Sequence, residues 1–163
     1  MAARYSLSSY DDHFCLKPPA LLWIAAVFLS RSVLLPFFMA FGSFFGLNSD
    51  TVALLREAWN LGSIAPSLIA AGVLVALIRR YPGAPRAVRW LSQNGRTLLA
   101  LSAAMDLVCS LIGQGSFEVS NTQLPPSWLL TAAADLYFLA YVLFARRVRD
   151  TFRDFPLPAT QSG

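Results

Sequence analysis

Four apolar stretches, each about the length of a membrane-spanning helix, occupy much of this 163-residue chain. They cover residues 20–42, 58–78, 97–113 and 128–145. Roughly 20 apolar residues cross the hydrocarbon core of a bilayer as a helix, and only helices and closed barrels satisfy their backbone hydrogen bonds in lipid. Because the stretches lack the alternating apolar and polar residues of barrel strands, they predict an all-α integral membrane bundle of four transmembrane helices.

The composition supports a membrane protein. Hydrophobic residues make up 56% of the chain and charged residues 13%, which is about half the charged fraction of an average soluble domain. So few polar side chains cannot cover a globule of this size. The two cysteines, Cys15 and Cys109, fall in a polar leader and in an apolar stretch respectively, so both are expected to be free thiols.

The basic residues indicate the orientation of the chain. Eleven of the 13 lysines and arginines lie in the leader (1–19), in the loop 79–96 or after the fourth stretch. Cytoplasmic segments carry such an excess, so both termini and this loop are expected in the cytoplasm. The net charge of +4 is thereby explained by topology, and no nucleic-acid partner is expected. The predicted divisions are the leader, a transmembrane domain over 20–149 and a cytoplasmic tail over 150–163 that we expect to be mobile.

The basic loop contains a helical pattern. Arg86, Arg89 and Arg96 recur with Gln93 at three- and four-residue steps, and apolar residues fall between them. One interpretation is a short helix on the inner leaflet whose arginines contact anionic lipid headgroups. The other is that these arginines only determine topology.

Three charged residues lie inside the apolar stretches, where a charge is costly and faces a partner or a cavity. A rise of 1.5 Å per residue places Arg31 and Asp135 roughly 16 Å, and Asp106 roughly 15 Å, from the cytoplasmic boundary. A guanidinium can bridge two carboxylates, so we predict that these three side chains meet near the midplane. Their cluster is interpreted either as a proton or cation site or as a buried polar contact that sets the register of the helices.

Other features suggest packing rather than chemistry. Ser63, Ser67 and Ala71 form a row of small residues that lets helices approach closely in lipid. Pro36 and Pro66 lie inside stretches, so kinks are expected there.

No catalytic motif is apparent. The leader residues Asp11, Asp12, His13 and Cys15 are of metal-binding type, but no second cluster supplies further ligands, so neither a metal nor another cofactor is expected. Phosphate loops, nucleophile elbows and HExxH motifs are absent from the sequence, and the prediction is a protein that is not an enzyme.

Short motifs spread along most of the chain resemble the YfeZ-type family of bacterial inner-membrane proteins. They are Tyr10-Asp11-Asp12, Leu16-Lys17-Pro18-Pro19 with Leu22-Trp23, Arg31, Arg79-Arg80-Tyr81-Pro82 with Arg89-Trp90-Leu91, and Ala134-Asp135-Leu136-Tyr137 followed by Arg146-Arg147-Val148-Arg149 and Phe152. The resemblance implies a multi-pass protein of the bacterial inner (plasma) membrane and supplies no activity. It does not extend to Asp106.

Two functions are expected from these features. The first is a non-enzymatic accessory or scaffold component of a membrane complex, in contact with lipid and with other membrane proteins or further copies of the chain. The alternative is a small proton- or cation-linked transporter or channel subunit that uses Arg31, Asp106 and Asp135.

Overall fold

The structure is a computed structural model that describes residues 16–42, 44, 46, 48, 50–52, 61–81, 83–115 and 126–153. Every regular element in these ranges is a helix. The elements are α1 (Ala20–Leu29), α2 (Arg31–Ala40), the 3-10 helix η2 (Leu61–Ser63), α4 (Ile64–Ile78), α5 (Arg86–Gln93), α6 (Gly95–Gly115), α7 (Pro126–Phe144) and α8 (Arg146–Arg153). The predicted all-α class is confirmed.

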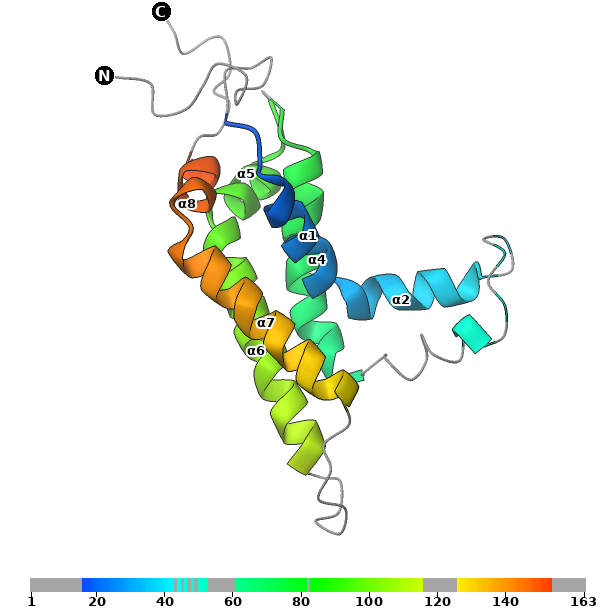
Figure 1. The fold of residues 1–163 in the computed structure, drawn as a ribbon. Coiled ribbons are helices and arrows are strands. Elements are labelled where there is room, and N and C mark those ends of the chain that lie inside the picture. The colour runs from blue at the N-terminus through cyan, green and yellow to red at the C-terminus, as the bar shows by residue number, and fades with distance from the viewer. Residues whose placement is uncertain are drawn as a thin grey trace, which may run out of the picture.

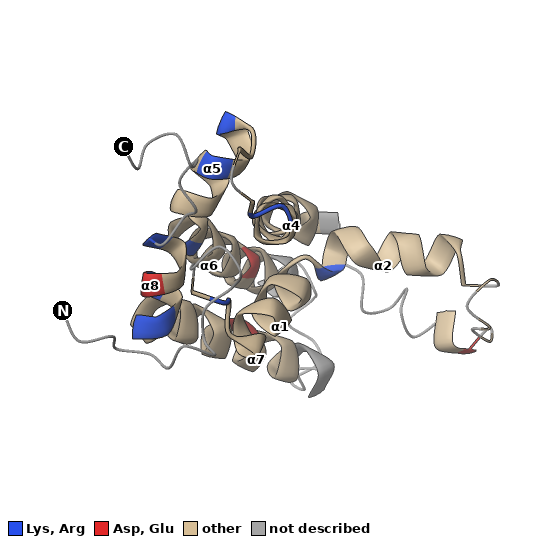
Figure 2. Cartoon of the chain, turned by 90° about the horizontal axis from the view of Figure 1, so that it is seen from above, with Lys and Arg blue, Asp and Glu red and all other residues tan. Residues whose placement is uncertain are grey.

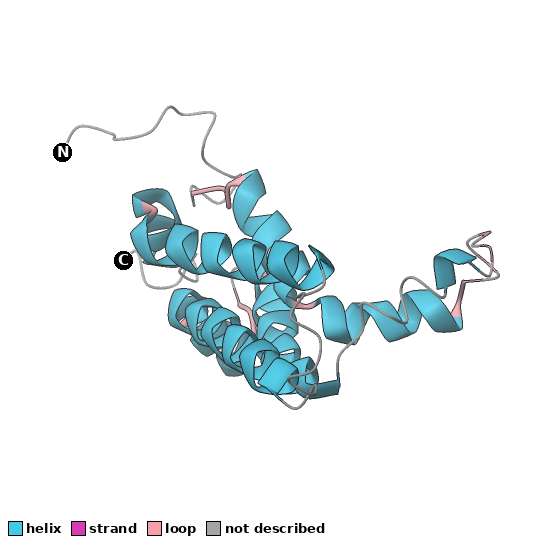
Figure 3. Cartoon of the chain, turned by 60° about the horizontal axis from the view of Figure 1, so that its bottom comes forward, coloured by secondary structure: helices cyan, strands magenta, loops and turns pink. Residues whose placement is uncertain are grey.

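Helices α1, α4, α6 and α7 pack into a bundle, α5 and α8 lie across one end of it, and α2 projects from its side (Figure 1). The same side arm is seen when the bundle is turned (Figure 3). The apolar core joins α1, α4, α6, α7 and α8. It consists of Leu22, Ala26, Leu29, Ala70, Val73, Leu77, Leu99, Ala103, Val142, Val148 and Phe152.

The helices differ in their ability to cross a membrane. Within the described residues, the segment Gly95–Ile112 of α6 is long and apolar enough by itself. Two bent pairs, α1 with α2 at 72° and α7 with α8 at 63°, raise the number of candidate spans to three if each pair counts as one span. Helix α4 is apolar but shorter. The number of transmembrane spans therefore stays a prediction.

The first apolar stretch is broken at Ser30, and helix α2 continues through Pro36. The hydroxyl of Ser30 donates to the carbonyl of Ala26 at 2.7 Å, a bond that often bends helices. The backbone N–H of Ser30 also donates to Ala26 and Val27. The expectation of one helix over 20–42 was therefore wrong, because a polar residue rather than a proline ends the first half.

Helix α8 is held firmly at the end of the bundle where α5 also lies, which we call the basic end. Val148, Thr151 and Phe152 of α8 are buried, and Arg80 donates to the carbonyl oxygens of both Leu16 (3.1 Å) and Thr151 (2.9 Å). The tail was predicted from the sequence to begin at residue 150, but α8 continues through residues 150–153 and ends at Arg153.

The contact between Gly95 and Phe152 offers a test of this docking. A Cβ atom on Gly95 would clash with Cε1 of the buried Phe152, whereas one on Gly72 would meet its nearest neighbour, Cδ2 of Leu91, at 3.9 Å. We expect Gly95→Ala to lower the free energy of unfolding by about 1–3 kcal/mol, because the aromatic ring must move in a packed site. Gly72→Ala, the matched control, should be neutral or stabilising by up to about 1 kcal/mol. Sodium dodecyl sulfate titration of the protein in mild detergent measures both, and equal effects would contradict the proposed close packing.

Candidate functional site

Arg31 lies at the break between α1 and α2, where the chain turns away from the bundle. It is the first residue of α2 and follows Ser30, which is fully buried. From this position its side chain reaches both α6 and α7. Because of the break, the guanidinium group of Arg31 points across the bundle toward α6 and α7.

Asp135 of α7 receives two hydrogen bonds from Arg31. Nη1 of Arg31 donates to Oδ1 at 3.1 Å, and Nη2 donates to Oδ2 at 3.2 Å. Such a two-point contact matches the planar guanidinium to the planar carboxylate and is among the stronger polar interactions in proteins. The Asp135 side chain is fully buried, while that of Arg31 is 18% exposed.

Asp106 of α6 completes the cluster. Its Oδ2 atom lies 2.6 Å from Nη2 of Arg31, an ion pair in which the same nitrogen also faces Asp135. Asp106 is 1% exposed, and neither of its carboxylate oxygens accepts a hydrogen bond with acceptable geometry from a described residue. Asp106 is thus held by charge but is incompletely satisfied by hydrogen bonding.

The surroundings of the cluster are aromatic on one side. The guanidinium carbon of Arg31 lies 4.4 Å from the ring centroid of Phe28, a distance at which a cation is attracted to the ring face. The ring of Phe28 packs against Phe138 of α7, with centroids 5.1 Å apart. Phe28 was not among the residues predicted from the sequence, because its contact with Arg31 forms across the break at Ser30.

One arginine against two aspartates leaves a formal charge of −1. Asp135 is the middle residue of α7 (Pro126–Phe144), and Asp106 lies one residue past the middle of α6 (Gly95–Gly115). The structure therefore brings the three predicted charges together halfway along the two longest helices. A charge excess at this depth can be offset by a proton, a cation or a rearrangement of Arg31.

The predicted row of small residues begins in η2 and continues along α4. Ser63, the last residue of η2, and Ser67 of α4 are buried, and Ala71 is half-buried. Ser102 of α6 donates to the carbonyl of Pro66 at 2.8 Å, a contact between α4 and α6 that the small-residue row makes room for.

The three arginines predicted to contact lipid have different surroundings. Arg86 is exposed, whereas Arg89 is half-buried. Arg96 donates from Nε to the carbonyl of Val142 and from Nη2 to that of Leu143. Arg96 therefore satisfies carbonyl groups at the end of α7, which have no partner within the helix.

The predictions for the two cysteines and for the leader have different outcomes. Cys109 is a free thiol, whereas Cys15 and the leader residues Asp11, Asp12 and His13 lie outside the described residues. In the described part of the chain, no three histidine, cysteine, aspartate or glutamate side chains are grouped so that they could hold a metal ion.

Comparison with known proteins gives a family. Residues 5–154 match the family described as "Protein of unknown function (DUF2919)". The chain belongs to this family. All three members of the charge cluster lie within the matched residues, and so do α5 and α8. No curated protein and no solved structure matches the chain.

The cluster predicts an order of stability among variants. Arg31→Leu should be the most destabilising, by about 3–5 kcal/mol, because it leaves two buried carboxylates without a counter-charge. Asp106→Asn should cost less than Asp135→Asn, because Asp135 makes both hydrogen bonds to Arg31. Arg31→Leu combined with Asp135→Asn should be more stable than Arg31→Leu alone.

Detergent unfolding of the single and double variants measures this coupling. Arg79→Leu, which removes an exposed arginine at the end of α4, is the control and should change stability by less than about 0.5 kcal/mol. Strict additivity of the Arg31 and Asp135 effects would contradict an energetic contact between them.

Proposed function

We propose that this protein is a multi-pass protein of the bacterial inner membrane that serves as a non-enzymatic accessory or scaffold component of a membrane complex. In this proposal the four apolar stretches lie in the membrane, the first of them as the broken segment of α1 and α2, and both termini are cytoplasmic. The likeness of its motifs to those of YfeZ-type proteins supports this location. The basic end supports the orientation, since stretches of the ribbon coloured blue for lysine and arginine lie on α5 and α8 when the bundle is seen from above (Figure 2).

The observation that carries the scaffold proposal is the projection of α2. This helix leaves α1 at 72° and has one buried residue, Ser32, among its ten. Phe37 is 61% exposed, and Phe38 and Phe41 are about half exposed. An apolar arm that packs so little against its own bundle offers a surface for another protein.

The depth of the arm strengthens this interpretation. Helix α1 spans about 15 Å, so a chain that enters from the cytoplasm reaches the break near the middle of the bilayer. At 72° to α1, helix α2 advances only about 5 Å further along that direction. Lipid does not satisfy backbone groups at the end of a helix, and such ends are tolerated at membrane depth where protein or a water-filled cavity covers them. A partner protein beside α2 would provide that cover.

Site-specific cross-linking in native membranes tests the proposal. A photoreactive amino acid at Phe37 of α2 should give protein adducts, because a partner covers the arm. The same amino acid at Leu136 of α7, a position of similar exposure (57%), is the control and should give lipid adducts. The mass of the adduct distinguishes a second copy of the chain from another protein. Identical adduct patterns at the two positions would contradict a partner at α2.

The charge cluster favours a second function, a small proton- or cation-linked transporter or channel subunit. The supporting observation is the formal charge of −1 together with the two oxygens of Asp106, which accept no hydrogen bond from a described residue. A buried carboxylate usually faces a partner or a cavity, and a proton or cation bound at Asp106 would offset the excess negative charge of the cluster.

Flux measurements separate the two functions. If the cluster carries protons, liposomes containing the protein should show potential-driven proton uptake that is lost in Asp135→Asn and in Asp106→Asn. Asp150→Asn, a change at the basic end outside the cluster, should leave the flux within about twofold, since surface substitutions away from such features have small effects. Absence of flux from correctly folded protein would reject this second function and leave the scaffold proposal standing.

A further inference from the structure

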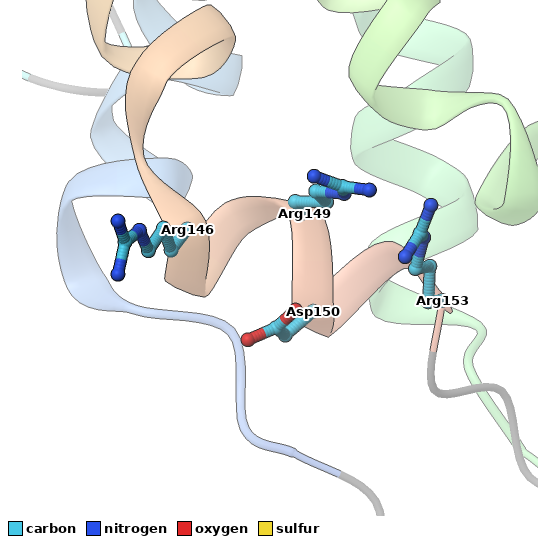
Figure 4. A pocket seen from close by; sticks show the side chains of 4 residues that line it. All are labelled: Arg146, Arg149, Asp150 and Arg153. Carbon is cyan, nitrogen blue, oxygen red and sulfur yellow. The ribbon is translucent and has the colours of Figure 1, made fainter. Parts of the chain in front are cut away.

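Helix α8 carries a basic pocket on its outer side, far along the chain from Arg31. The pocket has a volume of about 280 Å³ and is lined by Arg146, Arg149, Asp150 and Arg153. Steps of three and four residues place these side chains on one face of the helix, whereas Val148, Thr151 and Phe152 face the bundle and are buried. Figure 4 shows Arg149 and Arg153 extending to the same side, with Asp150 below them.

The backbone beneath the pocket is fixed. Arg80 holds the carbonyl of Thr151 at 2.9 Å, and the ring of Phe152 lies against Gly95. Arginines on a rigid helix lose less freedom when they bind a ligand than arginines on a flexible tail. The pocket is therefore preorganised in its backbone.

The three guanidinium groups of the pocket are available. Those of Arg146, Arg149 and Arg153 make no hydrogen bond or ion pair with any described residue, unlike Arg80 and Arg96, which bind backbone carbonyls. Three guanidinium groups and one carboxylate give the pocket a formal charge of +2. Guanidinium groups match the oxygens of a phosphate group in geometry and charge.

The neighbouring surface is apolar. Phe144, the last residue of α7, is 82% exposed, and Leu143 beside it is 42% exposed. Only Ala145 separates Phe144 from Arg146. A molecule that touches both surfaces needs an anionic head and an apolar tail, which is the chemistry of a phospholipid.

We propose that this pocket binds the phosphate group of an anionic phospholipid in the cytoplasmic leaflet. The inference rests on the proposed membrane location and orientation, because these place α8 at the level of the headgroups. The sequence predicted lipid contacts for the arginines of the basic loop. The present inference names a second site, on α8, and the class of lipid that binds there. The lipid would tie α8, and through Phe152 and Arg80 the adjoining helices, to the membrane surface.

Titration of delipidated, full-length protein in detergent with phosphatidylglycerol, read by native mass spectrometry, tests the proposal. The unmodified protein should bind phosphatidylglycerol more tightly than phosphatidylcholine. Arg149→Gln with Arg153→Gln should weaken phosphatidylglycerol binding roughly 10- to 30-fold, as expected for the loss of two basic side chains at a membrane surface. Lys17→Gln with Arg79→Gln removes the same charge from two exposed basic residues outside the pocket and should keep binding within about twofold of the unmodified protein.

Other outcomes would overturn the inference. Equal losses in the two double variants would mean diffuse attraction to basic residues, and no loss in either would mean that the pocket does not bind the lipid. Displacement of phosphatidylglycerol by millimolar inorganic phosphate would assign the pocket to free phosphate instead. Each double variant is first checked for an unchanged unfolding midpoint, and Arg149→Lys with Arg153→Lys, which keeps the charge, should retain more binding than the glutamine pair. A protein that stays monodisperse without lipid or detergent would contradict the membrane location itself, which separates that failure from failure of the pocket.

Discussion

A single half-buried guanidinium organises much of this bundle. Arg31 forms two hydrogen bonds with Asp135 and an ion pair with Asp106, so one side chain links the start of α2 to the middles of α6 and α7. A buried charge with no counter-charge is strongly destabilising, and this penalty restricts how the three helices can slide past one another. The break at Ser30 is part of the same arrangement, because it turns the chain where Arg31 must face inward.

The molecule has two surfaces that its own packing leaves open. Helix α2 carries exposed aromatic residues away from the bundle, and α8 carries exposed arginines across its end. Their chemistry differs, since one surface is apolar and the other is cationic. In the proposed membrane setting the first suits a protein partner and the second suits a phosphate headgroup, while the charge cluster lies between them inside the bundle.

Sequence reasoning succeeded where a regular helix converts residue number into position. A rise of 1.5 Å per residue gave similar depths for Arg31, Asp106 and Asp135, and the structure brings these side chains within hydrogen-bonding or ion-pair distance. It failed at the break, which was expected at Pro36 and lies at Ser30. A proline can remain within a helix when its neighbours compensate, whereas a serine bends a helix only if its hydroxyl bonds to the backbone, and that choice depends on the surrounding packing.

Hydrophobic runs and backbone hydrogen bonding are local properties, so the sequence by itself determined the all-α class and the approximate limits of α6 and α7. Only the tertiary structure decided which arginines bind the protein and which face outward. Arg80 and Arg96 donate hydrogen bonds to backbone carbonyls of other segments. In contrast, Arg146, Arg149 and Arg153 line the pocket on α8. Both groups of arginines lie in basic stretches of the sequence. They differ because the partner of a long side chain lies on another segment, and the position of that segment is set by the folded core.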